Sequence, residues 1–331
     1  MMSDRRISLF YLAAFMAVIL LVLLSLCLGA VHVSLPELLS AIRGDRSLSA
    51  YKILRYVRLP RVCAAMLCGA SLSASGAIIQ SVLHNPLGSP NVLGMNAGAA
   101  LAVIFCAAFL PFLPNLLPFA AFLGAFITLL LVTALGKCAG NSRVAVLLAG
   151  VAANTSFIAL SDAVTVFVPD TIYSRTAFKI GSLSGVQMNV LIPAALVIIL
   201  SLTLAFLLRH EIDVLALGEE SAHALGLPVT GLRLCALVLA ALLCGAGISF
   251  AGLVGFVGLI VPHCARMIVG SEMQRLLPAS LLLGAILMLL CDLLSRMLFA
   301  PHELPVGILL SLIGGPFFVM LLLKKKEMHR D

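Results

Sequence analysis

The polar side chains of one long apolar stretch are the residues of this sequence best placed to do chemistry. Between residues 144 and 168, Asn154, Ser161 and Thr165 recur at helical spacing, with Asp162 beside them. Polar groups that face lipid without partners are costly, so we expect these side chains to face water or the protein interior. The pattern favours a polar translocation path, with Asn154, Ser161 and Thr165 on its wall.

The sequence holds no residue pattern for covalent chemistry. It contains no G-x-x-x-x-G-K-[ST] loop to cradle ATP phosphates, no H-E-x-x-H, and no C-x-x-C among its nine cysteines. The histidines also lack metal-ligand spacing. We therefore expect no catalytic residue, no metal site and no cofactor, which favours a transport subunit over an enzyme.

The elements that position these residues must be membrane helices. Of the 331 residues, 62% are hydrophobic and only 11% are charged, against about a quarter charged in soluble domains. This composition excludes a soluble globular protein, because a water-facing surface needs more polar residues. The net charge of +7 is typical of the cytoplasmic loops of membrane proteins, so we do not expect nucleic acid as a partner.

The apolar runs predict an all-α polytopic membrane protein with ten transmembrane helices, forming one transmembrane domain over residues 1–331. Basic residues flank both ends, so the positive-inside rule places both termini in the cytoplasm, which requires an even number of spans. The eighth run is short and rich in glycine, and the longest internal loop is 209–228. The expected spans are 7–30, 62–83, 92–110, 116–136, 144–168, 190–208, 234–250, 253–265, 276–300 and 305–323.

The first external loop departs from the positive-inside rule. Six of the 21 Lys and Arg residues fall between residues 43 and 61, opposed by Glu37 and Asp45. A basic patch on the outer side indicates an acidic partner there, with an accident of topology as the alternative. Farther along, Asp292 and Arg296 are four residues apart, in the order that favours a pair within one helix, and Arg296 is close enough to the external end to snorkel.

The chain carries an internal repeat at an offset of 176 residues. Five spans separate the two copies, so they must be inverted in the membrane, as in transporters that alternate access around a central path. Within the first copy, small and polar residues align on one helix face, which favours a close helix–helix seam over pore lining. That face consists of Gly69, Ser73, Gly76 and Gln80, and the in-register Gly and Pro matches are Gly69/Gly245, Gly76/Gly252, Pro86/Pro262 and Gly94/Gly270.

Several ordered motifs resemble the FecCD family of permeases, the membrane subunits of type II ATP-binding-cassette (ABC) importers for ferric siderophores, haem and vitamin B12. The resemblance covers nearly the whole chain. It implies ten helices per subunit, two subunits around one path, and pseudosymmetry between helices 2–5 and 7–10. The motifs lie at 58–61, 75–77, 85–94, 147–151, 255–263 and 303–307.

The resemblance also implies roles for particular residues. The segment 216–227 is similar to the family's coupling helices, which rest on the ATPase subunit, and its expected contact residues are Gly218, Glu219, Glu220, Ala222, Leu225 and Gly226. The external arginines Arg58, Arg61 and Arg296 resemble those that receive acidic residues of a binding protein. Two loops resemble the cytoplasmic gate, with a looser match at the second; their residues are Asn85, Leu87, Asn141 and Ser142.

The sequence thus predicts the membrane permease subunit of an ATP-driven importer in a prokaryotic cytoplasmic membrane. The resemblance implies a homodimer with two ATPase subunits and an external substrate-binding protein. Ferric siderophore or haem is the expected cargo, with cobalamin as an alternative. The rival function is an ion-gradient-driven secondary transporter, which needs acidic or histidine coupling groups near mid-membrane, where only Asp162 is a loose candidate.

Overall fold

The described part of the chain is helical and built around long apolar helices. The structure is a computed structural model that describes residues 4–29, 49–140, 142–299 and 302–327. Among these residues, seven helical segments are long and apolar enough to cross a membrane. Their main helices are α1 (Asp4–Cys27), α4 (Leu59–Val82), α6 (Leu117–Cys138), α7 (Arg143–Phe167), α9 (Met188–Leu207), α12 (Val229–Ala251) and α14 (Met273–Met297).

Three further apolar helices coincide with the remaining expected runs. They are α5 (Met95–Phe109), α13 (Val257–Val269) and α15 (Val306–Glu327). The uncertain boundary between the seventh and eighth runs falls at a sharp backbone turn, since Gly252 and Phe256 both have positive φ. Gly252 favours such a conformation, whereas Phe256 is a strained exception that packs against Gly314 of α15.

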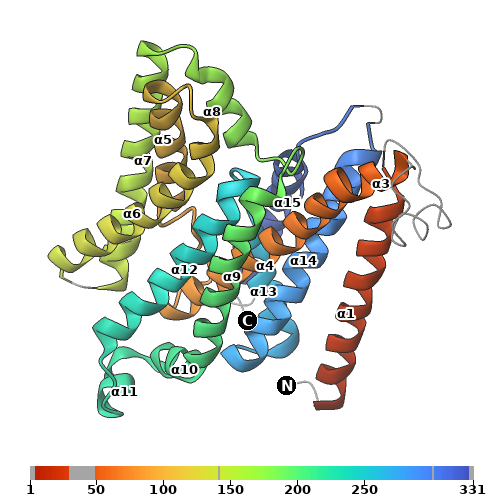
Figure 1. The fold of residues 1–331 in the computed structure, drawn as a ribbon. Helices are drawn as coiled ribbons and strands as arrows, with labels where there is room; N and C mark the ends of the chain where they lie inside the picture. Colours follow the sequence, from red (N-terminus) through yellow and green to blue (C-terminus); the bar gives the residue numbers. More distant parts are fainter. Residues whose placement is uncertain (1–3, 30–48, 141, 300–301, 328–331) are drawn as a thin grey trace.

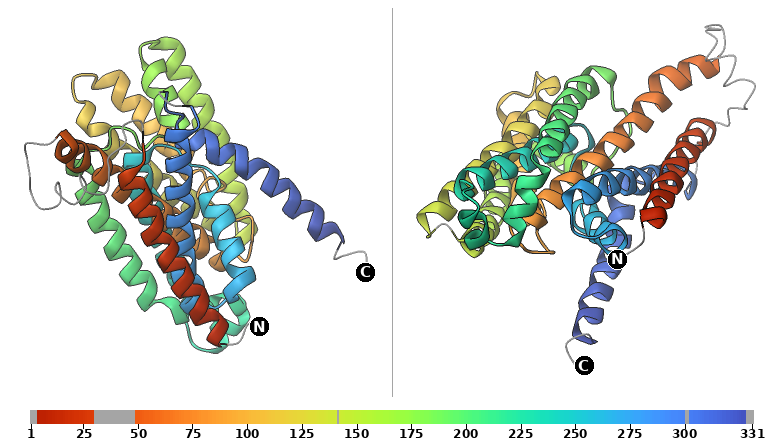
Figure 2. Two further views of the ribbon diagram at one scale, coloured as in Figure 1. Left: turned by 90° about the vertical axis from the view of Figure 1, so that its right-hand side faces the viewer. Right: turned by 90° about the horizontal axis from the view of Figure 1, so that it is seen from below.

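Helices α4, α12 and α14 form the centre of the bundle. Helix α4 packs along both α14 and α12, α12 also packs on α6 and α9, and α1 lies against α14 (Figures 1 and 2). Helix α7 is covered on fewer sides, and α15 projects away from the other helices (Figure 2). The chain's own contacts therefore bury one region deeply and leave α7 and α15 with free faces.

The polar stripe of α4 is a helix–helix seam, as the sequence predicted. Gly69 lies against Gly284 of α14 so closely that a Cβ at either position would overlap the backbone of the other. Ser73 donates a hydrogen bond to the Ser280 carbonyl oxygen at 2.8 Å. A Cβ at Gly76 would overlap the backbone of Gly258 in α13, and one at Gly258 would meet the Leu72 carbonyl oxygen of α4. Small residues allow this approach, and the backbone carbonyls satisfy the serine hydroxyl.

The repeat offset of 176 residues is wrong in its second half. It pairs Pro86, in the turns between α4 and α5, with Pro262, which lies inside α13. The helix starts give smaller offsets, because α4 and α12 begin at residues 59 and 229, and α5 and α13 begin at 95 and 257. Proline is compatible with both a turn and a short helix, so matching prolines did not fix the register.

Short helices occupy the two ends of the bundle. The N-terminus of α1 lies at the same end as α10 (Arg209–Leu217) and α11 (Glu219–Ala224) (Figure 1). The other end carries α8 (Thr171–Ile180) and α3 (Ser49–Ile53), which continues through the π-helix Leu54–Arg58 into α4. A 3₁₀ turn, Pro114–Leu116, precedes α6. Each end of the bundle thus carries its own set of short helices.

Candidate functional site

A mainly apolar cavity with a few polar groups lies between α5, α7 and α8. Its volume is about 200 Å³, and Asn154 and Ser161 of α7 are both on its wall. Thr165 is not among the lining residues, and its hydroxyl donates to the Ser161 carbonyl oxygen at 2.8 Å. The structure therefore brings two of the three expected path residues to one cavity. The lining residues are Asn91, Asn96, Ala97, Ala100, Ile104, Asn154, Ile158, Ser161, Arg175, Phe178, Lys179 and Leu253.

The cations of this cavity come from α8. The predicted spans 144–168 and 190–208 place this segment in a loop between them. Arg175 and Lys179 are four residues apart, so they share one face of α8. Arg175 forms an ion pair with Asp162 of α7, the residue noted beside the polar stripe. The amphipathic spacing of residues 171–180 predicts a helix. A search for apolar spans does not find it, because the segment is too polar.

The segment expected to couple to an ATPase forms two short helices at the opposite end. Gly218, with φ of 126°, separates α10 from α11. Ala222 is fully buried, whereas Leu217 and Leu225 are 71% and 65% exposed. Gly226 has positive φ and an exposed surface, and the side chains of Glu219 and Glu220 lie outside the described structure. The described surface of this segment is anchored at one alanine and projects two leucines.

One carboxylate joins the coupling segment to the central bundle. Asp213 of α10 accepts a hydrogen bond from the backbone N–H of Met273, the first residue of α14, at 2.8 Å. This contact satisfies one of the N–H groups that a helix start leaves without a partner. Burial raises the pKa of the Asp213 carboxyl above its ordinary value. A movement of α10 is thereby tied to the N-terminal end of α14.

The two loops expected to form a gate lie next to each other. Arg143 and His84 are 2.6 Å apart, and they adjoin Ser142 and Asn85 respectively. The Asn85 side chain accepts from the Leu87 backbone N–H at 2.9 Å, which shapes the first loop as an Asx turn. Ser142 is the N-cap of α7 and accepts from the Ala145 N–H at 3.0 Å. Leu87 is 37% exposed, and Asn141 lies outside the described residues.

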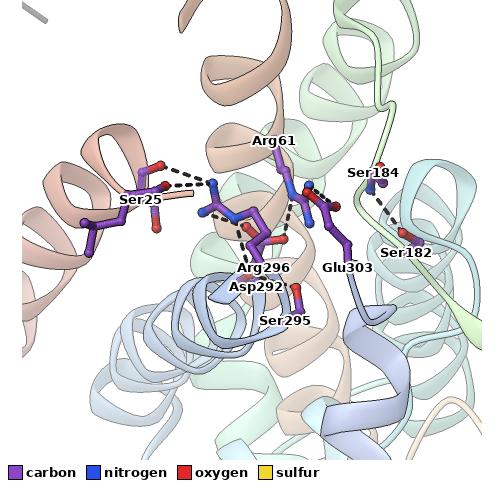
Figure 3. A network of polar contacts seen from close by, with 9 residues as sticks. Ser25, Arg61, Ser182, Ser184, Asp292, Ser295, Arg296 and Glu303 are labelled. Atoms are coloured by element: carbon purple, nitrogen blue, oxygen red, sulfur yellow. Dashed lines mark hydrogen bonds and ion pairs between the residues drawn. The ribbon is translucent and has the colours of Figure 1, made fainter. Parts of the chain in front are cut away.

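The external arginines are buried in a network within this chain (Figure 3). Arg61 pairs with Asp292 at 2.8 Å and with Glu303 at 2.7 Å, and Arg296 pairs with the same Asp292 at 3.1 Å. Arg58 lies close by, and all three arginines are at most 6% exposed. The sequence indicated the Asp292–Arg296 pair, which is confirmed, but the expected snorkelling of Arg296 is wrong because carboxylate and carbonyl partners hold it inside.

Backbone carbonyls of α1 complete the arginine network. Arg296 donates to the Ser25 and Leu28 carbonyl oxygens at 3.3 and 3.4 Å, and Arg58 donates to the Leu26 carbonyl oxygen. The last turn of a helix has carbonyls without helical partners and carries partial negative charge, so it attracts guanidinium groups. These contacts fasten the C-terminal ends of α1 and α14 to the N-terminal end of α4.

Comparisons with known proteins agree across almost the full length of the chain. A model of the FecCD transport family matches residues 17–324. The chain is 37% identical to the Fe(3+) dicitrate transport system permease protein FecD of Escherichia coli (92% of this chain, 95% of that protein). It is also 37% identical to the hemin transport system permease protein HmuU of Yersinia pestis (93% and 94%).

A solved structure shares the fold. The chain superposes on an inward-facing conformation of a putative metal-chelate type ABC transporter with a TM-score of 0.85. The identity is 30%, and the match covers 95% of this chain and 98% of that one.

Proposed function

The chain belongs to the FecCD transport family, and from this premise we propose that it carries a ferric chelate into the cytoplasm as half of an ATP-driven importer. It is a multi-pass membrane permease of the ABC importer type, in which the ATPase is a separate subunit. FecD and HmuU are named for Fe(3+) dicitrate and hemin, which supports iron bound to an organic chelator as the cargo. Cobalamin is the alternative cargo.

The observation that carries the coupling role is the exposed surface of residues 216–227. Leu217 and Leu225 project from a segment whose Ala222 is fully buried. Leu217 ends α10 and Leu225 follows α11, so the two exposed leucines flank a short, anchored helix and indicate a partner surface rather than a solvated loop. An ATPase groove receives α11 in this account, and Asp213 passes its displacement to α14. Gly218, Glu219, Glu220, Ala222, Leu225 and Gly226 form the proposed contact.

The contact between the gate loops supports a shared gate. Since Arg143 touches His84, the start of α7 cannot move without disturbing the loop that holds Asn85 and Leu87. We assign Asn85, Leu87, Asn141 and Ser142 to the cytoplasmic gate, and Asn154, Ser161 and Thr165 to the path beyond it. Closure of the ATPases then changes the gate through packed helices.

Ten spans with both termini in the cytoplasm account best for the ten apolar helices. The two halves share a packing pattern: α4 lies on α14 as α12 lies on α6, and α5 with α6 matches α13 with α14. Exchanging α4–α7 with α12–α15 reproduces these pairs, which supports an inverted repeat. The proposed cytoplasmic end carries α10 and α11.

A second copy of the chain covers the free face of α7 in this proposal. That face presents small and polar residues at helical spacing, and all are exposed: Ala152, Thr155, Ala159 and Ala163. Such a stripe suits close packing or a water-filled path better than it suits lipid. A homodimer, with two ATPases below and a binding protein above, packs the free faces of two α7 helices against each other.

In this proposal the binding protein docks at the outer end, at Arg58, Arg61 and Arg296. An acidic residue of the binding protein takes the place of a carboxylate that now pairs with these arginines. Glu303, a partner of Arg61, has a side chain that is 34% exposed. An acidic residue of the binding protein can replace Glu303 without uncovering Asp292. Such docking weakens with salt, because it depends on charges at a partly exposed surface.

Uptake into proteoliposomes tests the proposed function. The permease is reconstituted with its ATPase and binding protein, and the uptake of radioactive ferric dicitrate and haem is followed with ATP, with ADP, or with an imposed proton or sodium gradient. The proposal requires accumulation with ATP alone. Accumulation driven by an ion gradient without the ATPase would instead establish the secondary transporter.

A further inference from the structure

We propose that the cavity between α5, α7 and α8 receives a carboxylate arm of the transported chelate, with Lys179 as its charge-selecting residue. This inference rests on the proposed transport function and gives it a substrate class, which is chelates that carry free or partly free carboxylates. The observations are the charge, the donors and the size of one cavity.

The charge of the cavity is positive. Its lining includes Arg175 and Lys179 and no acidic residue. Asp162 pairs with Arg175 from outside the lining and neutralises it in large part. Lys179 is exposed, so its ammonium group adds positive charge that the Asp162–Arg175 pair does not cancel. An anion entering the cavity meets an attractive field, and a cation is repelled.

The remaining polar groups suit a carboxylate. Asn91, Asn96 and Asn154 each bring a side-chain amide, whereas the Ser161 hydroxyl already donates to the Phe157 carbonyl oxygen at 2.7 Å. Amide NH₂ groups donate hydrogen bonds, and donors on several sides of a carboxylate replace the water that it loses. Apolar residues form the rest of the wall, among them Ile104, Ile158 and Phe178, and they contact the carbon skeleton beside the carboxylate.

The volume decides how much of a chelate enters. Pockets that enclose whole drug-sized molecules have volumes of about 300–1,000 Å³, whereas this cavity has about 200 Å³. One carboxylate with its neighbouring carbons fits, and the whole metal complex does not. The cavity is therefore a side pocket that reads one arm of the chelate, while the metal centre stays outside it.

The rates at which anionic and cationic thiol reagents react with a new cysteine measure this selectivity, and no transport assay is needed. Ile158 lines the cavity and is 47% exposed, and Val151, on the same helix but outside the lining, is 53% exposed. Ile158→Cys and Val151→Cys are made separately in the full-length permease in nanodiscs. Each is reacted with anionic and cationic methanethiosulfonates of similar size, and mass spectrometry of the peptide that contains the new cysteine gives the rate.

The expected result is a preference for the anionic reagent at position 158. A single charge about 6 Å away in water changes the local concentration of a monovalent ion about threefold, so the ratio of the two rates changes about tenfold. We expect this ratio at about 10 mM salt, where screening is weak, and a smaller one at about 150 mM. Adding Lys179→Gln should abolish the preference, whereas Lys179→Arg and the distant Lys137→Gln should preserve it. Position 151 should show little preference.

Citrate then tests recognition of the carboxylate itself. Millimolar citrate should slow the reaction of Ile158→Cys with a neutral maleimide, and Lys179→Gln should remove the protection. Equal rates for both charged reagents at position 158, or protection that ignores Lys179, would overturn the inference. Neither assay uses ATP or an ATPase. Failure of ATP-driven uptake would therefore refute the transport function alone, whereas failure of these two assays would refute the carboxylate site alone.

Discussion

At the scale of single residues, Asp292 is the side chain on which the outer end depends most. It is fully buried between Arg61 and Arg296, which would repel each other without it. The desolvation cost of such a group is offset only while every charge keeps its partner. Its role is to hold three helices in one arrangement, more than to add net stability.

Asp292→Asn should therefore destabilise the permease by about 3–5 kcal/mol, because it leaves two buried guanidinium groups without a counter-charge. Thermal unfolding in detergent measures the loss. It is followed by circular dichroism, because the chain has no tryptophan for fluorescence. Glu303→Gln is the matched control, since that side chain is 34% exposed and its pair should contribute only about 0.2–1 kcal/mol. Equal losses in both variants would contradict the network described above.

Asp213 gives a prediction in which the sign of a pKa shift matters. Its pKa is raised, so the fold favours the protonated form, and stability is lost as the pH rises from the ordinary aspartate pKa through that raised value. Asp213→Asn keeps an acceptor for the Met273 N–H and removes this cost. At pH 7 it should be as stable as the wild type or more so, with the difference shrinking as the pH falls through the raised pKa.

The control for this prediction is Asp213→Ala, which leaves the Met273 N–H without its acceptor. We expect it to lose about 1–3 kcal/mol at every pH tested. Unfolding midpoints between pH 4 and 7 separate the two variants. A strongly destabilised Asp213→Asn would show that the negative charge itself, and not the hydrogen bond, holds α10 to α14.

At the scale of helices, close packing at glycine sets the arrangement of the central bundle. A methyl group at Gly69 would overlap the Gly284 carbonyl and push α4 away from α14. Gly69→Ala should thus cost about 1–3 kcal/mol through overpacking. Gly231→Ala in α12 is the control, because a Cβ there meets nothing within 4 Å. A similar melting temperature for both variants would mean that the seam yields easily.

The sequence predicted the apolar helices well because lipid imposes a simple requirement on them. A run of apolar residues marks a span whatever its neighbours are, so the expected runs and the observed helices differ by only a few residues at their ends. The seam on α4 was also predictable, since Gly69 and Gly76 share a face with Ser73. Helix α8 was missed because its composition is too polar to mark a span, although its residues have an amphipathic helical spacing.

Partners distant in sequence were the part that could not be predicted. Arg61 finds Asp292 across 231 positions, and Arg143 finds His84 across 59. The charge count predicted an excess on the outer side, but not that Asp292 and a carbonyl at the end of α1 hold two of those charges, Arg61 and Arg58. The cations of the cavity could not be predicted for the same reason, because only the packing of α8 places Lys179 in the same cavity as Asn154.

At the scale of the whole molecule, the account places α8 and α11 on opposite sides of the membrane. Tyr173 and His223 are both exposed, the former at 83%. A membrane-impermeant maleimide added to intact cells should label Tyr173→Cys and not His223→Cys, whereas inverted vesicles should give the reverse. External labelling of His223→Cys would overturn the ten-span topology and the roles assigned to both ends.

In the proposed importer, force from an ATPase enters this molecule through the segment 216–227. ATP-driven uptake by Leu225→Asp tests this role, because the substitution puts a charge on an exposed leucine of the coupling surface. We expect the variant to fold and form its dimer with an unchanged melting temperature, to lose the ATPase during purification, and to lose ATP-driven uptake. Normal uptake and normal ATPase retention in this variant would remove the coupling role from this segment.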